Sequence, residues 1–454
     1  MKIELRQIAR DLGDVPEMRP PVPPAEYESR MVELYSRAGV DWVVVYADRE
    51  HSGNTTFLCN YDPRFEEGLL LLGPKGIRYL VIGVEGLSYV DIVPVDIECL
   101  QCDSLSLPGI PRTTPRLEDV LKDAGIGPGM SVGVVGWKYL EPEETDDTTE
   151  PSFVPVWLVN VLRSLVGKDG TVTDSTQLMI HPETGMRANN SAAQIAAFEW
   201  AGRFASTSVF RAVRGTRPGM TERKAFSQVN YSGEPIPFFP TFITTSSYFV
   251  NGLRSPSAKK IEYGDAIVMG YGTWGSLCAR GGLVQGHVDE SYLATLVEPY
   301  YRAMATWYQT LRVGISGGEV YSTIEQVFEG MAIHSTLNPG HLISIEEWLN
   351  TPIRPDSDYK LRSGMAFQAD MIPGPLPESQ MILCEDTVVL ADGVLRDEIK
   401  AGYPEMWGRI EERRTFLKNE LGVQINDDLL PLSNAAAYLP PFWLLDDLVC
   451  VVSS

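Results

Sequence analysis

Two kinds of hydrophobic pattern alternate along the first part of the chain. Residues 25–38 place apolar side chains at helical spacing and stop at Gly39, which predicts a helix. The runs DWVVVYAD, GLLLLG and RYLVIGV are rich in β-branched residues or leucine and are typical of buried strands. Further helices are predicted near 117–124 and 157–167. Strands that alternate with helices in this way predict an α/β domain.

The pattern changes near residue 190. Asn190 and Ser191 can cap a long helix over about 192–213, and Thr221 can cap another that begins in TERKAFSQVNY. Strand-like runs such as FFPTFITTS and DAIVMGYGTW follow, with helices between them. These patterns predict a second domain with strands and helices of its own.

The length of the chain also indicates more than one domain. A chain of 454 residues is too long for one small core. We therefore expect an N-terminal domain over 1–185, a catalytic domain over 186–410 and a C-terminal extension over 411–454 that packs on the core.

Three polar groups interrupt apolar, strand-like segments between residues 337 and 389. They are His341 in LNPGHLISIEEWLNTP, Asp370 in LRSGMAFQADMIPGP and Glu385 in MILCEDTVV. A polar group inside an apolar strand costs free energy unless a partner satisfies it. Three such groups in so short a stretch predict that they converge on one site.

The composition of the chain excludes some classes of binding partner and cellular location. A net charge of −22 argues against nucleic acid and anionic membrane surfaces, and it is compatible with a cationic or zwitterionic ligand. The longest apolar runs are too short to span a bilayer, and no secretion signal is visible at the N-terminus, so we expect a cytoplasmic protein. The six cysteines are sparse, which fits free thiols, and the lone Cys99–Cys102 pair has no partner motif for metal binding.

Six motifs, in this order, resemble the creatinase/aminopeptidase P superfamily. They are SAAQIAAFEWAGR, RPGMTE, EYGDAIVMGYG, NPGHLISIEE, LRSGMAFQAD and CEDTVVLADG. The segments AEYESRMVELYSRAGVDWVVV and FLCNYDPRFEEGLLLLGP are similar to that family's N-terminal domain. The resemblance covers about 25–400 and implies an α/β two-domain fold, with a creatinase-type N-terminal domain followed by a pita-bread α+β catalytic domain. It also implies a homodimer.

The resemblance implies a metal site that is incomplete here. Family peptidases hold two divalent ions with two aspartates, one histidine and two glutamates. His341 and Glu385 match the histidine and the second glutamate, while Asp370 replaces the first glutamate. The two aspartates would fall at Gly270 and at about Gly281, and the run YGTWGSLCARGGLV contains no acidic residue in any register. We therefore expect no metal cofactor, although His341 with two carboxylates leaves room for a single weakly held divalent ion.

The remaining residues form a plausible acid–base set. His341 can transfer a proton near neutral pH, and Asp370 and Glu385 form a carboxylate pair in which one member can hold a raised pKa. Two further histidines of the peptidases are missing, with Asn251 and Trp348 in their places. The predicted substrate-binding residues are Arg280, Arg254, Trp348, Asn251 and Arg64. For Arg280 a second interpretation is a structural arginine paired with a carboxylate.

These features favour a creatinase-like hydrolase that cleaves a non-peptide C–N bond of a small nitrogen-containing metabolite without metal. Three alternatives stay open at this point. They are a metal-dependent Xaa-Pro-type peptidase, a lyase of a betaine- or sulfonium-like compound, and a catalytically inactive binding protein with the pita-bread fold.

Overall fold

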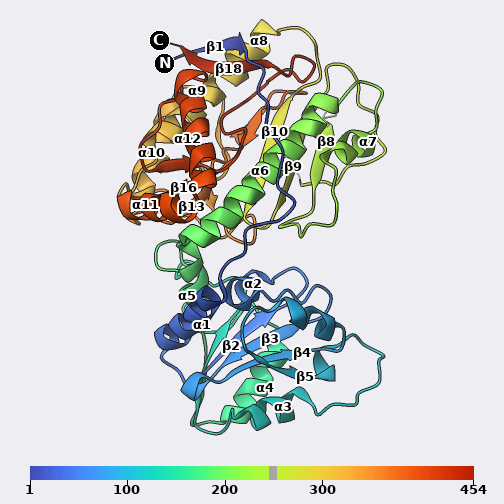
Figure 1. Cartoon of the computed structure of the whole chain (residues 1–454), viewed down its shortest axis with the longest axis vertical. Helices are drawn as coiled ribbons and strands as arrows, with labels where there is room; N and C mark the ends of the chain where they lie inside the picture. The colour runs from blue at the N-terminus through green and yellow to red at the C-terminus, as the bar shows by residue number, and fades with distance from the viewer. Residues whose placement is uncertain (245–252, 454) are drawn as a thin grey trace. The chain divides into compact units, whose positions relative to one another are not determined.

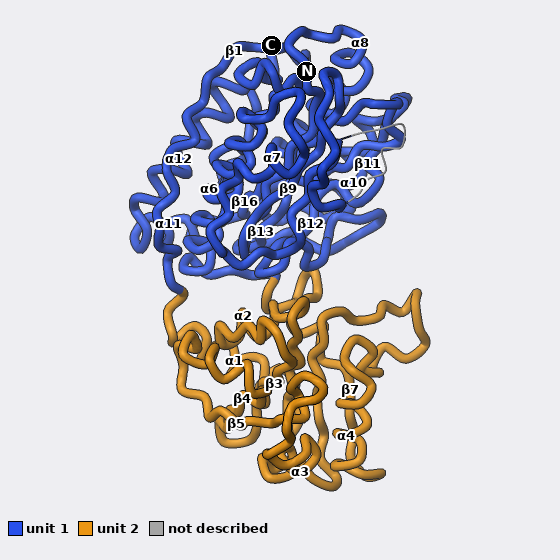
Figure 2. Tube along the Cα trace, turned by 90° about the vertical axis from the view of Figure 1, so that its right-hand side faces the viewer, with its two compact units in different colours: residues 1–21, 188–454 blue, residues 22–187 orange. Residues whose placement is uncertain are grey.

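The computed structural model describes residues 1–244 and 253–453 of the chain. They form two compact units, which Figure 2 shows in different colours. One unit is Val22–Arg187, and the other combines Met1–Pro21 with Ala188–Ser454. The first 21 residues therefore group with the C-terminal unit, which corrects the sequence-based assignment of 1–185 to the N-terminal domain.

The Val22–Arg187 unit is built on a six-stranded sheet in the order β5-β4-β3-β2-β6-β7 (Figure 1). Strands β2 and β3 pair antiparallel, as do β3 and β4, and the other neighbours pair parallel. The strands are β2 (Trp42–Ala47), β3 (Gly68–Leu72), β4 (Arg78–Ile82), β5 (Glu98–Gln101), β6 (Ser131–Val135) and β7 (Thr171–Asp174). The helices are α1 (Pro24–Ala38), α2 (Gly53–Cys59), α3 (Leu117–Ala124), α4 (Val156–Val166) and α5 (Gln177–Ile180).

Both faces of the central strands β2 and β3 are buried, which explains why these strands read as continuous apolar runs. Trp42, Val44 and Tyr46 pack in one core with the apolar faces of α3 and α4. The alternate residues Val43 and Val45 are buried as well. The α/β character predicted for this part of the chain is confirmed.

The second unit holds two four-stranded sheets. The first has the order β15-β10-β9-β8, and the second has the order β12-β13-β16-β17. The first consists of β8 (Thr241–Thr244), β9 (Ala266–Thr273), β10 (Ser276–Leu283) and β15 (Leu383–Glu385). The second consists of β12 (His341–Leu342), β13 (Ala366–Gln368), β16 (Thr387–Leu390) and β17 (Leu429–Pro431).

The long helix α6 (Ala192–Gly215) packs against both sheets (Figure 1). Its first turns contact the second sheet through Ile195 and Phe198, and its last turns contact β9 and β10 through Val209 and Val213. Ser191 caps it by accepting a hydrogen bond from the Gln194 amide, as the sequence predicts. One rigid helix therefore fixes the two sheets that carry the candidate site.

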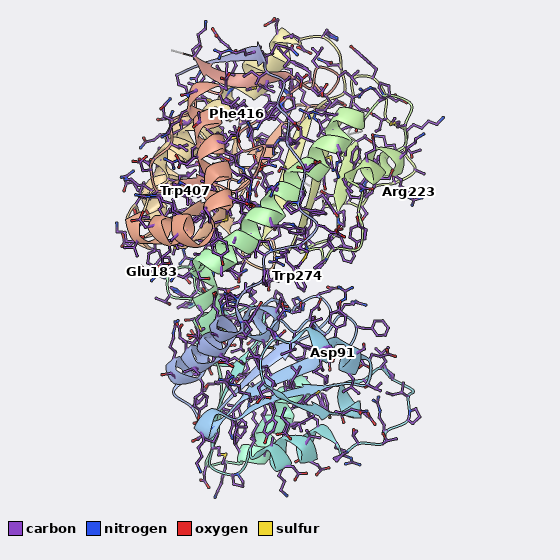
Figure 3. The ribbon with its side chains drawn as sticks, viewed as in Figure 1. Asp91, Glu183, Arg223, Trp274, Trp407 and Phe416 are labelled. Atoms are coloured by element: carbon purple, nitrogen blue, oxygen red, sulfur yellow. The ribbon has the colours of Figure 1, made fainter. Side chains whose placement is uncertain are left out.

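The other helices cover the outer surfaces of this unit. They are α7 (Glu222–Phe226), α8 (Glu290–Tyr292), α9 (Glu298–Thr310), α10 (Gly317–Phe328), α11 (Gly393–Gly402) and α12 (Pro404–Asn419). Trp407 and Phe416 mark α12 in Figure 3. Short strands β11 (His334–Ser335) and β14 (Pro373–Gly374) also pair.

Residues near the two ends of the chain complete the same unit. Strand β1 (Lys2–Gln7) pairs antiparallel with β18 (Leu448–Ser453). Strand β17 pairs with β16 in the second sheet, and residues 411–454 belong to this unit. Of the helices in residues 1–244 and 253–453, none combines the length and the apolar character needed to cross a bilayer.

Candidate active site

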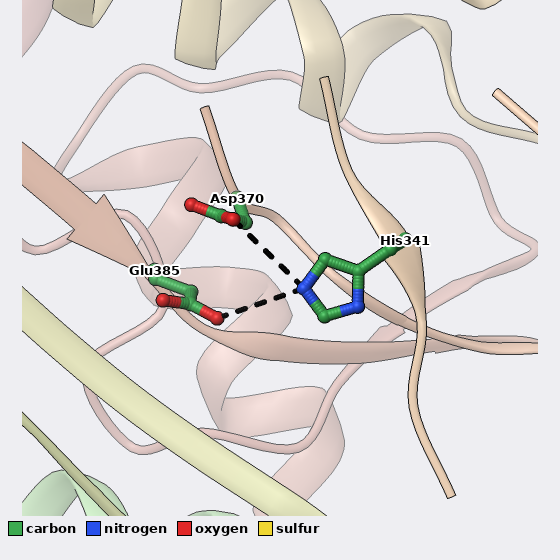
Figure 4. A group of neighbouring side chains, drawn as sticks. All are labelled: His341, Asp370 and Glu385. Atoms are coloured by element: carbon green, nitrogen blue, oxygen red, sulfur yellow. Dashed lines mark ion pairs between the residues drawn. The ribbon is translucent and has the colours of Figure 1, made fainter. Parts of the chain in front are cut away.

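The three predicted site residues meet where the two sheets of the second unit adjoin (Figure 4). Glu385 ends β15 in the first sheet, and a single residue, Asp386, links it to β16 in the second. His341 begins β12, and Asp370 lies two residues beyond β13. One donor atom from each of the three residues lies within 4.8 Å of the others. All three side chains are buried.

The imidazole of His341 has a defined orientation. Its Nδ1 lies 3.2 Å from the carbonyl oxygen of Leu342, which only accepts, so Nδ1 carries the hydrogen. Its Nε2 then points toward three carboxylates. The distances are 3.0 Å to Oε1 of Glu347, 3.9 Å to Oδ2 of Asp370 and 4.0 Å to Oε1 of Glu385. One base and three acids therefore lie close together, and of these four side chains Glu347 is the most exposed.

Some polar atoms of this cluster have a hydrogen-bond partner among the described residues, and others have none. Gln368, the strand partner of His341, donates from its side chain to Oε1 of Glu385 at 3.0 Å. Within the described residues, Nε2 of His341 and Oδ1 of Asp370 are buried without a hydrogen-bond partner. The approach of Glu347 to Nε2 is therefore an ion-pair contact and not an aligned hydrogen bond. Buried polar atoms of this kind mark a place where a ligand or water is expected.

Burial and neighbouring carboxylates favour the protonated forms of Asp370 and Glu385, and the same carboxylates favour the protonated imidazole of His341. Burial would lower the pKa of His341, but the charges of Glu347 and Asp370 outweigh it and raise that pKa above its usual value. Burial raises the pKa of Asp370 to about 6, and Glu347 adds to the effect. Burial, together with Asp370 and Glu347, raises the pKa of Glu385 well above its usual value. The cluster can therefore hold an acid and a base together at neutral pH.

Glu385→Gln should raise the thermal stability of the protein at pH 8 by a few degrees in Tm, measured with a chelator present. The glutamine keeps the acceptor for Gln368 and removes a buried like charge. Because the folded-state pKa of Glu385 is raised, the wild type loses stability as pH rises above about 4.3, the ordinary glutamate value. The advantage of the variant should therefore shrink toward pH 4. An equal or larger gain at pH 4 would contradict a raised pKa.

The residues do not fit the two-metal site that the resemblance implies. Gly270, Ala279 and Glu385 are register partners across β9, β10 and β15, so they share one face of the sheet. Gly281 lies on the same face, two residues along β10. A side chain at Gly281 would collide with Met381 and Leu383, so apolar groups occupy the space where a ligand would lie. His341, Asp370 and Glu385 are the described residues that could hold one ion.

Arg280 is buried and paired, so its contacts do not support the first interpretation, a substrate-binding arginine. Its side chain is 0% exposed and forms an ion pair of 2.8 Å with Asp386. All three guanidinium nitrogens donate hydrogen bonds, to acceptors that include the carbonyl oxygens of Tyr438 and Glu385. The reason is strand alternation. Arg280 lies between Ala279 and Gly281, so it points to the face opposite the site. The structural interpretation is the one that the contacts support.

The other predicted arginines have partners of their own. Arg254 is 45% exposed and makes a bidentate pair with the buried carboxylate of Glu222, at 2.8 and 3.0 Å. Arg64 belongs to the Val22–Arg187 unit, is 46% exposed and lies over the ring of Tyr89. Roles for Arg254 and Arg64 in substrate binding stay predictions. Asn251 lies outside the described residues.

Trp348 lies directly at the cluster. Its ring stacks on the imidazole of His341, with centroids 4.2 Å apart and an interplanar angle of 23°. The residue is nevertheless 43% exposed. Trp274, labelled in Figure 3, lies in the two-residue turn between β9 and β10.

Two residues of the cluster are absent from the sequence-based prediction. Glu347 is the carboxylate closest to His341, and Gln368 holds Glu385 in place. The signal for Glu347 is the acidic pair in LISIEEWLN, which interrupts an apolar run just before Trp348. Gln368 gives no such signal, because an uncharged amide in a strand has many ordinary roles.

Comparison with known proteins supports the fold. No family model and no curated protein sequence matches the chain. Among solved structures, it is similar to the prolidase from Pyrococcus horikoshii OT3, with a TM-score of 0.62 and 17% identity over 81% of this chain and 95% of that one. It is also similar to an Xaa-Pro dipeptidase from Bacillus anthracis (TM-score 0.59, 16% identity, 81% and 95% covered). A third is the X-Pro aminopeptidase from Thermotoga maritima MSB8 (TM-score 0.61, 18% identity, 80% and 95% covered).

These similarities confirm the predicted fold. The chain has the two-domain α/β architecture of prolidases and Xaa-Pro aminopeptidases, with a pita-bread second domain. At such low identity the likeness concerns the fold, so the chemistry has to be argued from the site itself.

Proposed function

We propose that the protein is a hydrolase that cleaves a non-peptide C–N bond of a small nitrogen-containing molecule by acid–base catalysis without metal. One observation carries this proposal. Three carboxylates surround Nε2 of a buried histidine, while the two positions expected for metal-binding aspartates are glycines. The proposal includes the view that this is a metal site that has lost two of its five ligands and has an aspartate in place of a third.

The cluster can supply each proton transfer that hydrolysis needs. Glu385, with its strongly raised pKa, is the natural acid and gives a proton to the departing nitrogen. His341 or Asp370 accepts a proton from the attacking water, whose oxygen forms the new bond to carbon. The C–N bond then breaks, and the proton taken from water returns to Glu385 through the cluster. The sum is one water consumed for each bond cleaved.

Elemental analysis together with a substrate screen tests this function. We expect the purified protein to contain substoichiometric transition metal. We also expect it to hydrolyse a member of a panel of guanidino, ectoine-like and betaine-like compounds at a rate that EDTA leaves unchanged. Two tightly bound ions per chain, or cleavage of Xaa-Pro dipeptides only after Mn²⁺ is added, would overturn the proposal in favour of a metallopeptidase. Release of an alkene in place of an alcohol or acid product would show elimination.

A further inference from the structure

The loop of residues 344–349 folds back onto the strand that carries His341. The amide of Leu342 donates to the carbonyl of Asn350 at 2.7 Å, and the amide of Leu349 donates to the carbonyl of Leu342 at 2.9 Å. These bonds close the base of the loop beside His341. Neighbours on the loop, Glu347 and Trp348, both contact the imidazole as a result.

Trp348 offers a flat aromatic surface at the edge of the cluster. One side of its ring lies on His341, and 43% of the residue stays exposed to solvent. Indole is the side chain that attracts cations most strongly over its face. A ring fixed by stacking loses little conformational freedom when it binds a ligand.

The charges of the cluster favour a cation at this place. In the described part of the chain no lysine or arginine pairs with Glu347, Asp370 or Glu385, so no permanently charged side chain neutralises Glu347. The side chain of Glu347 is 23% exposed, more than that of Asp370 or Glu385. Its Oε1 lies 3.0 Å from Nε2 of His341. Glu347 is therefore the carboxylate best placed to meet an incoming ligand.

We propose that Glu347 and Trp348 form a recognition subsite for a nitrogen cation, a guanidinium or alkylammonium group, on the molecule that the site acts on. The cation lies over the indole ring and pairs with the carboxylate, while its remainder reaches His341, Asp370 and Glu385. This assignment rests on the proposed function only in taking the cation to be part of the substrate. The recognition itself concerns binding and involves no bond cleavage.

Calorimetric titration with methylguanidinium tests the subsite in the presence of EDTA, with methylurea as a neutral probe of the same shape. The wild type should bind one methylguanidinium per chain and bind methylurea at least about tenfold more weakly. Trp348→Leu and Glu347→Gln should each weaken methylguanidinium binding by about tenfold, and Trp348→Phe should keep most of the affinity.

Trp157→Leu is the matched control, since Trp157 is also 43% exposed and lies on α4. It should leave binding unchanged, and circular dichroism should show that all variants are folded. The subsite is overturned if the wild type does not bind methylguanidinium, if methylurea binds equally well, if the variants bind like the wild type, or if binding requires added Mn²⁺. The titration measures binding and no turnover. If the hydrolase test showed bound metal and so overturned the proposed function, the titration would still decide whether the subsite exists.

Discussion

Replacing Arg280 with methionine should lower the free energy of unfolding by about 3–5 kcal/mol. The variant leaves the carboxylate of Asp386, whose side chain is 1% exposed, without its positive partner. Ser433 and the amide of Ala437 still donate to that carboxylate, but neither neutralises its charge. Urea unfolding followed by tryptophan fluorescence measures the loss.

Two controls separate this effect from a general sensitivity to substitution. Arg312→Met removes the exposed pair with Glu319, which spans 3.4 Å, and should change stability by no more than about 0.5 kcal/mol. Adding Asp386→Leu to Arg280→Met removes both charges and should recover part of the lost stability. A loss in Arg280→Met no larger than that in Arg312→Met would mean that Arg280 is not buried with Asp386.

His341→Ala should reduce kcat/KM for the substrate found in the screen by about 10²–10⁴-fold, the usual contribution of one acid–base group. The variant removes the nitrogen on which Glu347, Asp370 and Glu385 converge. Steady-state kinetics across pH 5–9 should show the largest loss where the wild type is most active.

His334 provides the matched comparison, because it is exposed and lies on β11. His334→Ala should keep wild-type kinetics. Turnover in His341→Ala equal to that of the wild type would remove His341 from the mechanism, provided that thermal unfolding shows the variant to be folded.

Local patterns predicted much of this molecule. The helix caps at Ser191 and Thr221 and the buried strands follow from short-range chemistry, and the structure has them. The convergence of His341, Asp370 and Glu385 was also predictable, because three polar groups in apolar strands need partners. The convergence was predictable although the three residues are separated along the sequence.

Two features of the site were not predicted: the orientation of Arg280, which depends on strand register, and the position of Glu347, which depends on loop closure. Arg280 is a cation in the segment where the family's metal ligands would fall, which made it a candidate for substrate binding. Strand alternation turns its side chain away from the site. Glu347 reaches His341 only because its loop closes on Leu342 and Asn350. Neither one-residue register nor loop closure is encoded by hydrophobic periodicity.

The pairing of β1 with β18 has a consequence for how the molecule is made. The first strand leaves the ribosome early, while its partner is synthesised after both sheets of the site. All strands of the Val22–Arg187 unit are synthesised after β1 and before β18, so this unit can fold during synthesis. The unit with the candidate site must instead wait for nearly the whole chain. Until β18 is made, β1 lacks the strand with which it pairs in the folded protein.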